Sequence, residues 1–293
     1  MTRTVVTGGA GFLGSHLADE LAARGHQVIV FDQKHSAYLP AGQRQIVGGL
    51  DDFDQLCRML EGVDYVYHFA ALADLNRARE LPRETAQINV LGTVNMLEAA
   101  RRAGVKRFVF SSTIYVYSSE GSFYRASKQA CEAYIEEFEQ RFGLAYTILR
   151  FGSLYGPRAD DTNGMYRLLQ QAAKEGKVRY QGRPDDAREY IHVADAARLS
   201  ADILAPEYAN QHLVITGHTA LRARDLFTMF SEILGKEIAV DYVQPDIPDG
   251  HYRLTPYQYH PRVGRKLTSN LFVDFGQGMI QVLEQIFHED PAA

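Results

Sequence analysis

Cysteine is scarce in this chain, with two among 293 residues. Cys57 and Cys131 lack a CxxC partner, and both fall within stretches of helical periodicity. Two isolated cysteines are too few for a disulfide framework or a zinc site. We therefore expect buried or helix-face thiols in a reducing compartment, and no bound metal.

Long hydrophobic runs and basic tracts are also missing. No stretch approaches the roughly 20 apolar residues that span a bilayer, and a strand pattern begins at Arg3, where a leader would lie. The net charge of −5, without a cluster of Lys and Arg, disfavours nucleic acid as a partner. An apolar content of 46% is ordinary for a folded protein. We expect a cytoplasmic protein with a small ligand, bound to neither membrane nor nucleic acid.

Hydrophobic runs alternate with amphipathic stretches in the first half of the chain. This alternation predicts repeated β-α units, and hence a parallel sheet covered by helices on both faces. We expect an α/β fold with a doubly wound, Rossmann-type sheet in residues 1–150. The predicted strands are 3–7, 27–31, 64–68, 106–111 and 145–150, and the predicted helices are 12–24, 52–61, 83–103 and 125–142.

The pattern is looser beyond residue 150. We expect residues 151–293 to form a smaller C-terminal α/β lobe that mainly binds substrate, with some segments returning to the core. Its predicted strands are 178–180, 189–191, 212–215 and 237–242, and its predicted helices are 165–175, 193–204 and 222–234.

Three glycines follow the first predicted strand. Gly8, Gly11 and Gly14 recur every three residues, directly before the first predicted helix. Glycines let the backbone turn tightly and approach a pyrophosphate, whose charge is stabilised at the positive end of a helix dipole. Because strand, turn and helix occur in order, the motif predicts a dinucleotide site. The alternative is an ordinary glycine-rich turn.

Asp32 ends the second predicted strand, about 20 residues after the glycine turn. A carboxylate at this point accepts hydrogen bonds from the adenosine ribose and repels a 2′-phosphate, so NAD is favoured over NADP. Alternatively, Asp32 caps the loop that follows it. Lys34 and Arg44 lie nearby and oppose the preference for NAD.

Tyr124 and Lys128 share one face of a predicted helix, and the preceding strand carries Ser111 and Thr113 near its end. A phenol titrates near 10, but the Lys128 ammonium and a positive nicotinamide ring would both favour the phenolate. We expect Tyr124 to act as general base on a substrate hydroxyl that Thr113 orients, while a hydride passes to NAD beside Ser111. The alternative is a solvated surface helix.

Together these features resemble the extended short-chain dehydrogenase/reductase family, in its NAD-dependent nucleotide-sugar epimerase/dehydratase branch. The resemblance covers nearly the whole chain. The matching motifs are TGGAGFLG at 7–14, HFAA at 68–71, NVLGTVN at 89–95, and residues 105–113, 124–128, 149–158 and 188–193.

The resemblance implies a nucleotide-diphosphate sugar as substrate and a homodimer formed through the helices at 83–103 and 125–142. Arg188 would bind the substrate diphosphate through its planar guanidinium, unless it is a surface ion-pair partner. The implied substrate site also includes Ser153, Thr113 and Tyr124. The full set of expected NAD-binding residues is Gly8, Gly11, Phe12, Leu13, Gly14, Asp32, Leu50, Phe69, Ala70, Ala71, Asn89, Ser111, Tyr124 and Lys128.

The chain departs from the family pattern at several positions. Gly49 replaces an aspartate near the adenine, Ser153 an asparagine near the substrate phosphate, and Ser118 a glycine. The segment from Thr113 to Tyr124 is about half its usual length, which predicts a more open sugar pocket. Either Arg253 or Arg262 is a candidate for a second phosphate-binding arginine.

The residues after Thr113 narrow the choice of reaction. Ile114 and Tyr115 stand where 4,6-dehydratases of this family carry an Asp-Glu pair and decarboxylases a Glu, so elimination and decarboxylation are disfavoured. We expect a nucleotide-sugar epimerase that oxidises the sugar transiently, at C4 by preference. The alternatives are an NAD-dependent nucleotide-sugar or alcohol oxidoreductase, and a non-catalytic NAD-binding sensor.

Overall fold

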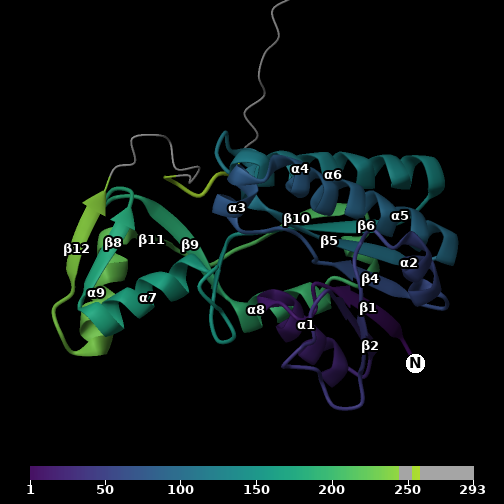
Figure 1. Ribbon diagram of the computed structural model, residues 1–293, viewed down its shortest axis with the longest axis horizontal. Coiled ribbons are helices and arrows are strands. Elements are labelled where there is room, and N and C mark those ends of the chain that lie inside the picture. Colours follow the sequence, from purple (N-terminus) through teal and green to yellow (C-terminus); the bar gives the residue numbers. More distant parts are fainter. Residues whose placement is uncertain (244–252, 258–293) are drawn as a thin grey trace, which may run out of the picture. The chain divides into compact units, whose positions relative to one another are not determined.

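The computed structural model describes residues 1–243 and 253–257. A seven-stranded parallel sheet organises this part of the chain, with strand order β10-β6-β5-β4-β1-β2-β3 (Figure 1). The order reverses between β1 and β4, which in open α/β sheets marks the crevice where ligands bind. The strands are β1 (Arg3–Thr7), β2 (Gln27–Asp32), β3 (Arg44–Val47), β4 (Tyr65–His68), β5 (Arg107–Thr113), β6 (Tyr146–Phe151) and β10 (Gln211–Ile215).

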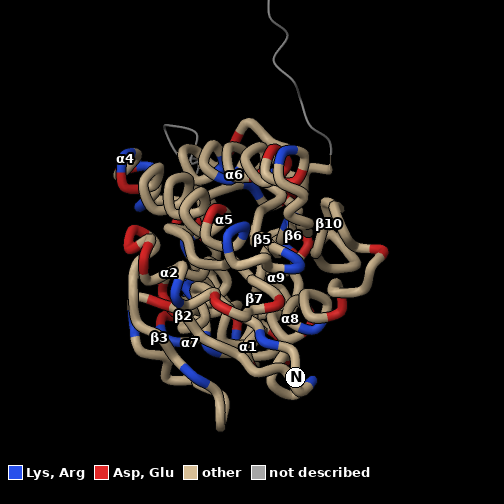
Figure 2. Tube along the Cα trace, turned by 90° about the vertical axis from the view of Figure 1, so that its right-hand side faces the viewer, with Lys and Arg blue, Asp and Glu red and all other residues tan. Residues whose placement is uncertain are grey.

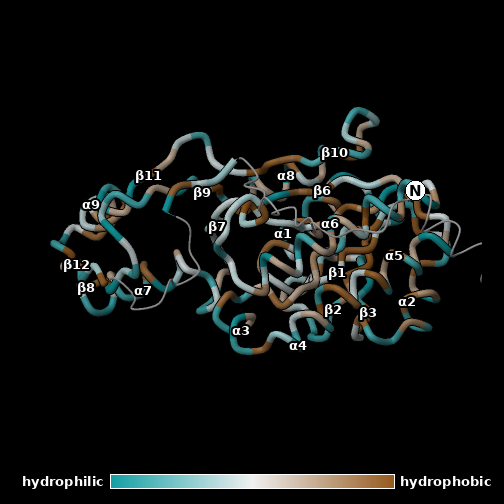
Figure 3. The backbone as a smooth tube through the Cα atoms, turned by 90° about the horizontal axis from the view of Figure 1, so that it is seen from above, coloured by the Kyte–Doolittle hydropathy of each residue, from teal (hydrophilic) through white to brown (hydrophobic). Residues whose placement is uncertain are grey.

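Helices cover both faces of this sheet, as predicted. On one face, α1 (Phe12–Ala23) and α8 (Val193–Asp202) pack against the sheet. On the other lie α2 (Phe53–Leu60), α5 (Gly92–Ala103) and α6 (Ser122–Phe142). The central strands are apolar on both sides, and Figure 3 shows hydrophobic stretches near β1 and β2. The predicted doubly wound α/β fold is confirmed.

Several short elements escaped the sequence prediction, two of them in the first part of the main sheet and the loop after β4. Strand β3 (Arg44–Val47) is a half-exposed edge strand without an apolar run, and α3 (Leu75–Glu80) is only six residues long. The predicted helix at 83–103 is three consecutive segments: α4 (Pro82–Thr85), a π-helical stretch (Ala86–Leu91) and α5. Helix α6 begins at Ser122 rather than at residue 125, so Tyr124 lies in its first turn.

The later part of the chain contributes to the main sheet and also builds smaller sheets. Strand β10 pairs with β6, and β7 (Ser153–Tyr155), β9 (Ala187–His192) and β11 (Ala220–Arg222) form a three-stranded sheet. A third apolar cluster joins β8 (Lys177–Gln181), β12 (Ala239–Val243), α7 (Gly164–Glu175) and α9 (Ala223–Leu234). The division into residues 1–150 and 151–293 stays a prediction, and its C-terminal end lies outside the described residues.

Charges of both signs are interspersed along the described chain (Figure 2). Within the described residues, no helix is both long and apolar enough to cross a membrane. The same part of the chain holds no group of three or more His, Cys, Asp and Glu side chains arranged to hold a metal ion.

Candidate functional site

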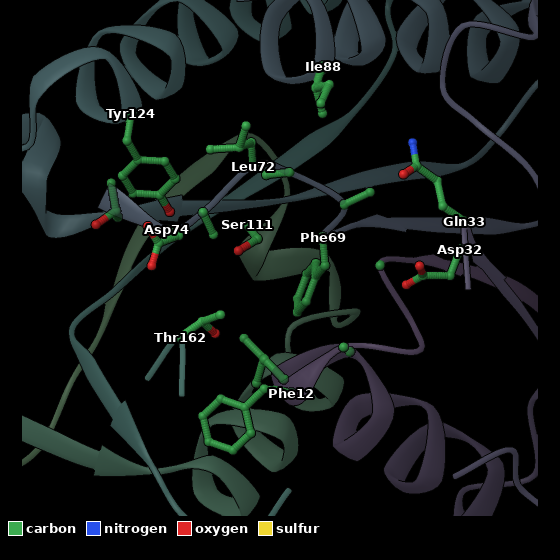
Figure 4. Close-up of a pocket in the computed structure, with 18 of the residues that line it drawn as sticks. Phe12, Asp32, Gln33, Phe69, Leu72, Asp74, Ile88, Ser111, Tyr124 and Thr162 are labelled. Carbon is green, nitrogen blue, oxygen red and sulfur yellow. The ribbon is translucent and has the colours of Figure 1, made fainter. Parts of the chain in front are cut away.

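A cavity of about 570 Å³ opens at the carboxyl edge of the main sheet. Its walls come from the glycine turn after β1, the end of β2, the loop after β4, the end of β5 and the start of α6 (Figure 4). Most of the predicted site residues line it: Gly8, Gly11, Phe12, Leu13, Gly14, Asp32, Leu50, Phe69, Ala70, Ala71, Ser111, Thr113 and Tyr124.

The glycine turn is packed so closely that side chains do not fit. Gly8 has φ +69°, and a Cβ added there would lie 2.7 Å from the backbone nitrogen of Ala70. A Cβ on Gly14 would lie 2.2 Å from the carbonyl oxygen of Gly8, whereas on Gly11 the same contact would be 3.1 Å. Helix α1 starts directly after this turn without a side-chain cap. Its first N–H groups are therefore suited to bind an anion such as a pyrophosphate.

Asp32 is held at the adjacent corner of the cavity by two backbone groups. Its Oδ2 accepts from the N–H of Ala10 (3.1 Å) and its Oδ1 from the N–H of Lys34 (3.2 Å). The carboxylate therefore caps the following loop and also faces the cavity, so the two readings of Asp32 are compatible. Lys34 lines the cavity as well, whereas Arg44 starts β3 opposite Ile29, on the side away from the carboxyl edge.

The turn and Asp32 together fit a dinucleotide. Side chains at Gly8 and Gly14 would collide with the protein's own backbone, so only glycine keeps the turn this tight. The uncapped end of α1 beside it stabilises phosphate charge. Gly49 stands where the family pattern has an aspartate. A Cβ added to Gly49 would lie 2.2 Å from Oδ1 of Asp51. The Asp51 carboxylate thus occupies the space of the side chain that Gly49 lacks.

Tyr124 and the hydroxyls at the end of β5 form the opposite end of the cavity. Thr113 accepts a hydrogen bond from the N–H of Tyr115 (3.3 Å) and so caps a 3₁₀ turn (Ile114–Tyr117). The surrounding protein desolvates the Tyr124 phenol, which raises its pKa. The lower pKa of Tyr124 that the sequence predicted therefore requires the positive ring of a bound oxidised cofactor, and it stays a prediction.

Lys128 lies behind Tyr124 and is only 2% exposed. Its Nζ donates to the carbonyl oxygen of Ser111 (2.6 Å) and lies 4.5 Å from the Phe110 ring centroid and 5.7 Å from that of Tyr124. Burial lowers the pKa of Lys128 to about 8. The ammonium is outside the cavity lining and fixes the end of β5 against α6.

Asn89 also lies behind the lining. Its Oδ1 accepts from the N–H of Leu72 (2.7 Å), while its Nδ2 donates to the carbonyl of Leu72 (3.1 Å) and to Oγ of Ser127 (2.9 Å). Ser127 Oγ in turn donates to the carbonyl of Tyr124 (2.7 Å). Asn89 thus connects the loop after β4 to the first turn of α6, and its predicted contact with the cofactor stays untested.

His68 is fully buried at the end of β4 and connects β1 to α5. Oγ1 of Thr7 accepts from the N–H groups of Phe69 and Ala70 (both 3.1 Å), so its own proton points to Nδ1 of His68 (2.8 Å). The ring proton is then on Nε2, which donates to Oγ1 of Thr93 (3.0 Å). Full burial lowers the pKa of His68 to about 3, so the ring is neutral. Both ring nitrogens are thus engaged in hydrogen bonds within the core.

A buried ion pair supports the hydroxyl end, and sequence reasoning missed it. Ser112 Oγ donates to Oε1 of Glu132 (2.5 Å), and Arg150 binds both oxygens of Glu132 (3.1 and 2.6 Å). Arg150 Nη1 also donates to the hydroxyl of Tyr117 (2.6 Å). Ser112, directly before Thr113, and Tyr117, at the end of the turn after it, are thus both hydrogen-bonded to this pair. No spacing in the sequence pointed to this pair, because it joins α6 to β6.

Two predicted substrate residues lie away from the cavity lining. Ser153 is in β7 and Arg188 is in β9. The cavity is lined instead by Gly152 and Leu154, on either side of Ser153, and by residues 160, 162 and 163. Their binding roles stay predictions. Arg253 is described but does not line the cavity, and Arg262 lies outside the described residues.

Comparison with known proteins agrees with this geometry. The model of the NAD dependent epimerase/dehydratase family matches residues 4–215. The chain belongs to this family. Membership confirms the resemblance predicted from the motifs and identifies NAD as the cofactor, which the glycine turn and Asp32 fit.

Individual relatives include enzymes of two activities. The chain is 28% identical to a UDP-glucose 4-epimerase of Mycolicibacterium smegmatis, over 85% of each chain. It is 32% identical to UDP-glucuronic acid decarboxylase 1 of Arabidopsis thaliana, over 66% of this chain and 49% of that one. Among solved structures, UDP-glucose 4-epimerase of Thermotoga maritima with UDP-glucose superimposes with a TM-score of 0.78 at 30% identity, covering 88% of this chain and 90% of that one.

Proposed function

We propose that this protein is a nucleotide-sugar 4-epimerase with a UDP-hexose as substrate. The observation that carries the proposal is that one cavity holds the glycine turn and Asp32 at one end and Thr113 and Tyr124 at the other. The names of the epimerase relatives support UDP as the nucleotide and C4 as the reacting carbon.

The chain's own residues handle a proton and the position of the sugar. Thr113 orients the C4 hydroxyl toward Tyr124, whose phenolate removes the hydroxyl proton as the ring carbon is oxidised. Bound NAD supplies reversible hydride acceptance at this carbon. The keto sugar then turns in the cavity, and Tyr124 returns the proton to the oxygen after the opposite face is reduced.

The chain offers no carboxylate for a competing elimination directly after Thr113. Ile114 is buried and Tyr115 follows it, so a 6-hydroxyl meets no acid from this segment. Reversible oxidation is therefore favoured over dehydration or decarboxylation.

We further propose a cytoplasmic homodimer that pairs α5 and α6 with their copies. Apolar side chains remain exposed on these helices or just before them, among them Leu91, Tyr134 and Phe142. Such side chains are suited to a shared helical interface. Light scattering on a sizing column tests this, and a monomeric mass would contradict the dimer.

Replacing the base tests the reaction. Tyr124→Phe is expected to lower interconversion of UDP-glucose and UDP-galactose by about 10²–10⁴-fold, measured by NMR of the sugar ring. Tyr65→Phe is the control, because Tyr65 starts β4 at the opposite edge of the sheet. Turnover that is unchanged in Tyr124→Phe contradicts the proposed base. Stoichiometric appearance of NADH with wild-type protein instead identifies an oxidoreductase, and NAD binding without turnover identifies a sensor.

A further inference from the structure

Asp74 contributes a carboxylate to the cavity that sequence reasoning did not single out. It precedes α3, in the loop that follows β4, and lines the same cavity as Ser111, Thr113 and Tyr124. In Figure 4 its carboxylate lies close to Tyr124 and Ser111, at the end of the cavity where the reacting sugar belongs.

The backbone of α3 holds the carboxylate of Asp74 in place. Its Oδ1 accepts from the N–H of Arg77 (2.8 Å), as the side chain of a helix N-cap. The guanidinium of Arg77, in the same helix, pairs with another carboxylate: its Nη2 lies 3.4 Å from Oε1 of Glu84. In the described part of the chain, Asp74 belongs to no ion pair.

The whole cavity has an excess of negative charge. The ionisable residues other than Tyr124 along its wall are Asp32, Lys34, Asp74, Arg77, Glu84 and Asp160. Four are acidic and two are basic. Hydrogen bonds from the hydroxyl and the N–H of Thr162, with a smaller contribution from Lys34, hold the pKa of Asp160 below its usual range, so Asp160 is charged. A ligand that brings another carboxylate close to Asp74 meets repulsion that solvent screens only in part.

We propose that Asp74 selects nucleotide sugars whose hexose is uncharged and discriminates against uronic-acid sugars. The inference rests on the proposed function for the location of the sugar. The carboxylate accepts hydrogen bonds from sugar hydroxyls, which are donors, and repels a sugar carboxylate, which is not. Among nucleotide sugars with the same diphosphate, the charge on the sugar ring is then the property that this cavity distinguishes.

The test compares the binding of one matched pair of ligands. UDP-glucose and UDP-glucuronic acid differ only at C6, and their dissociation constants are measured by calorimetry on the NAD-loaded protein. Wild-type protein is expected to bind UDP-glucose at least about tenfold more tightly, the ratio that ~1.4 kcal/mol produces. Asp74→Asn keeps a side chain that caps helices equally well and is expected to reduce that ratio about tenfold.

A second N-cap aspartate provides the control. Oδ1 of Asp52 accepts from the N–H of Gln55 (2.9 Å) in the same way, at the start of α2, but Asp52 does not line the cavity. Asp52→Asn is expected to leave the binding ratio unchanged. The proposal is overturned if wild-type protein binds the uronic-acid sugar equally well, if it binds neither sugar, or if Asp74→Asn retains the wild-type ratio.

Turnover of the same two sugars separates this proposal from the proposed function. Selective binding without epimerisation leaves the role of Asp74 intact and contradicts the 4-epimerase. Epimerisation with equal binding of both sugars supports the 4-epimerase and contradicts the role of Asp74.

Discussion

The two ends of the cavity are built in different ways. At the phosphate end the backbone makes the site, and the decisive feature is that Gly8 and Gly14 carry no side chain where none would fit. At the hydroxyl end buried side chains make the site, through the Glu132–Arg150 pair and the amide of Asn89. The difference predicts opposite sensitivities. An added methyl group should disrupt the first end, whereas the loss of one buried charge should disrupt the second.

The largest effect is expected at the hydroxyl end. Arg150→Leu leaves the buried Glu132 carboxylate with the hydroxyl of Ser112 but without its guanidinium partner, and the Arg150 and Glu132 side chains are 15% and 9% exposed. Breaking a buried pair in this way costs about 3–5 kcal/mol of unfolding free energy, measured by urea denaturation. Arg102→Leu is the control: its partner Glu98 forms an exposed pair on α5, for which about 0–1 kcal/mol is expected. Equal costs for both variants would show that the burial of the pair has no energetic consequence.

At the phosphate end the expected effect is on cofactor affinity. Gly14→Ala places a Cβ 2.2 Å from the oxygen of Gly8, so the turn must open and NAD affinity should fall by about 100-fold or more, since ~2.7 kcal/mol of distortion suffices. Gly11→Ala, with a 3.1 Å contact, should lose less. Fluorescence titration with NADH gives both constants. A larger loss in Gly11→Ala would contradict the steric account.

His68, which connects β1 to α5, makes the stability of the protein depend on pH. Unfolding returns the ring to a pKa near 6.5 from about 3 in the folded protein. Between these values the unfolded chain binds more protons, so stability is complete above about pH 6.5 and falls as the pH decreases toward 3, by up to ~1.4 kcal/mol per unit. His68→Gln should be less stable at neutral pH and show a shallower acid slope in urea denaturation. An unchanged slope would assign the acid sensitivity to other groups.

Local sequence determined the elements that carry the chemistry. The strand, the glycine turn and α1 are contiguous, so the motif of Gly8, Gly11 and Gly14 could be recognised without a structure, and Asp32 was predicted from its distance to that motif. The close approach of Gly8 to Ala70 depends on tertiary structure. The shared helix face of Tyr124 and Lys128 was predictable in the same way, because one helix sets their spacing.

Tertiary structure alone decided which side chains reach the cavity. Lys128 and Asn89 were expected at the cofactor but lie behind the lining, whereas Asp74 was not expected and faces the sugar end. Contacts of this kind join strands and helices far apart in the chain, as when Glu132 of α6 meets Arg150 of β6. Spacing along the sequence does not determine them, because they depend on how whole elements pack around a shared core.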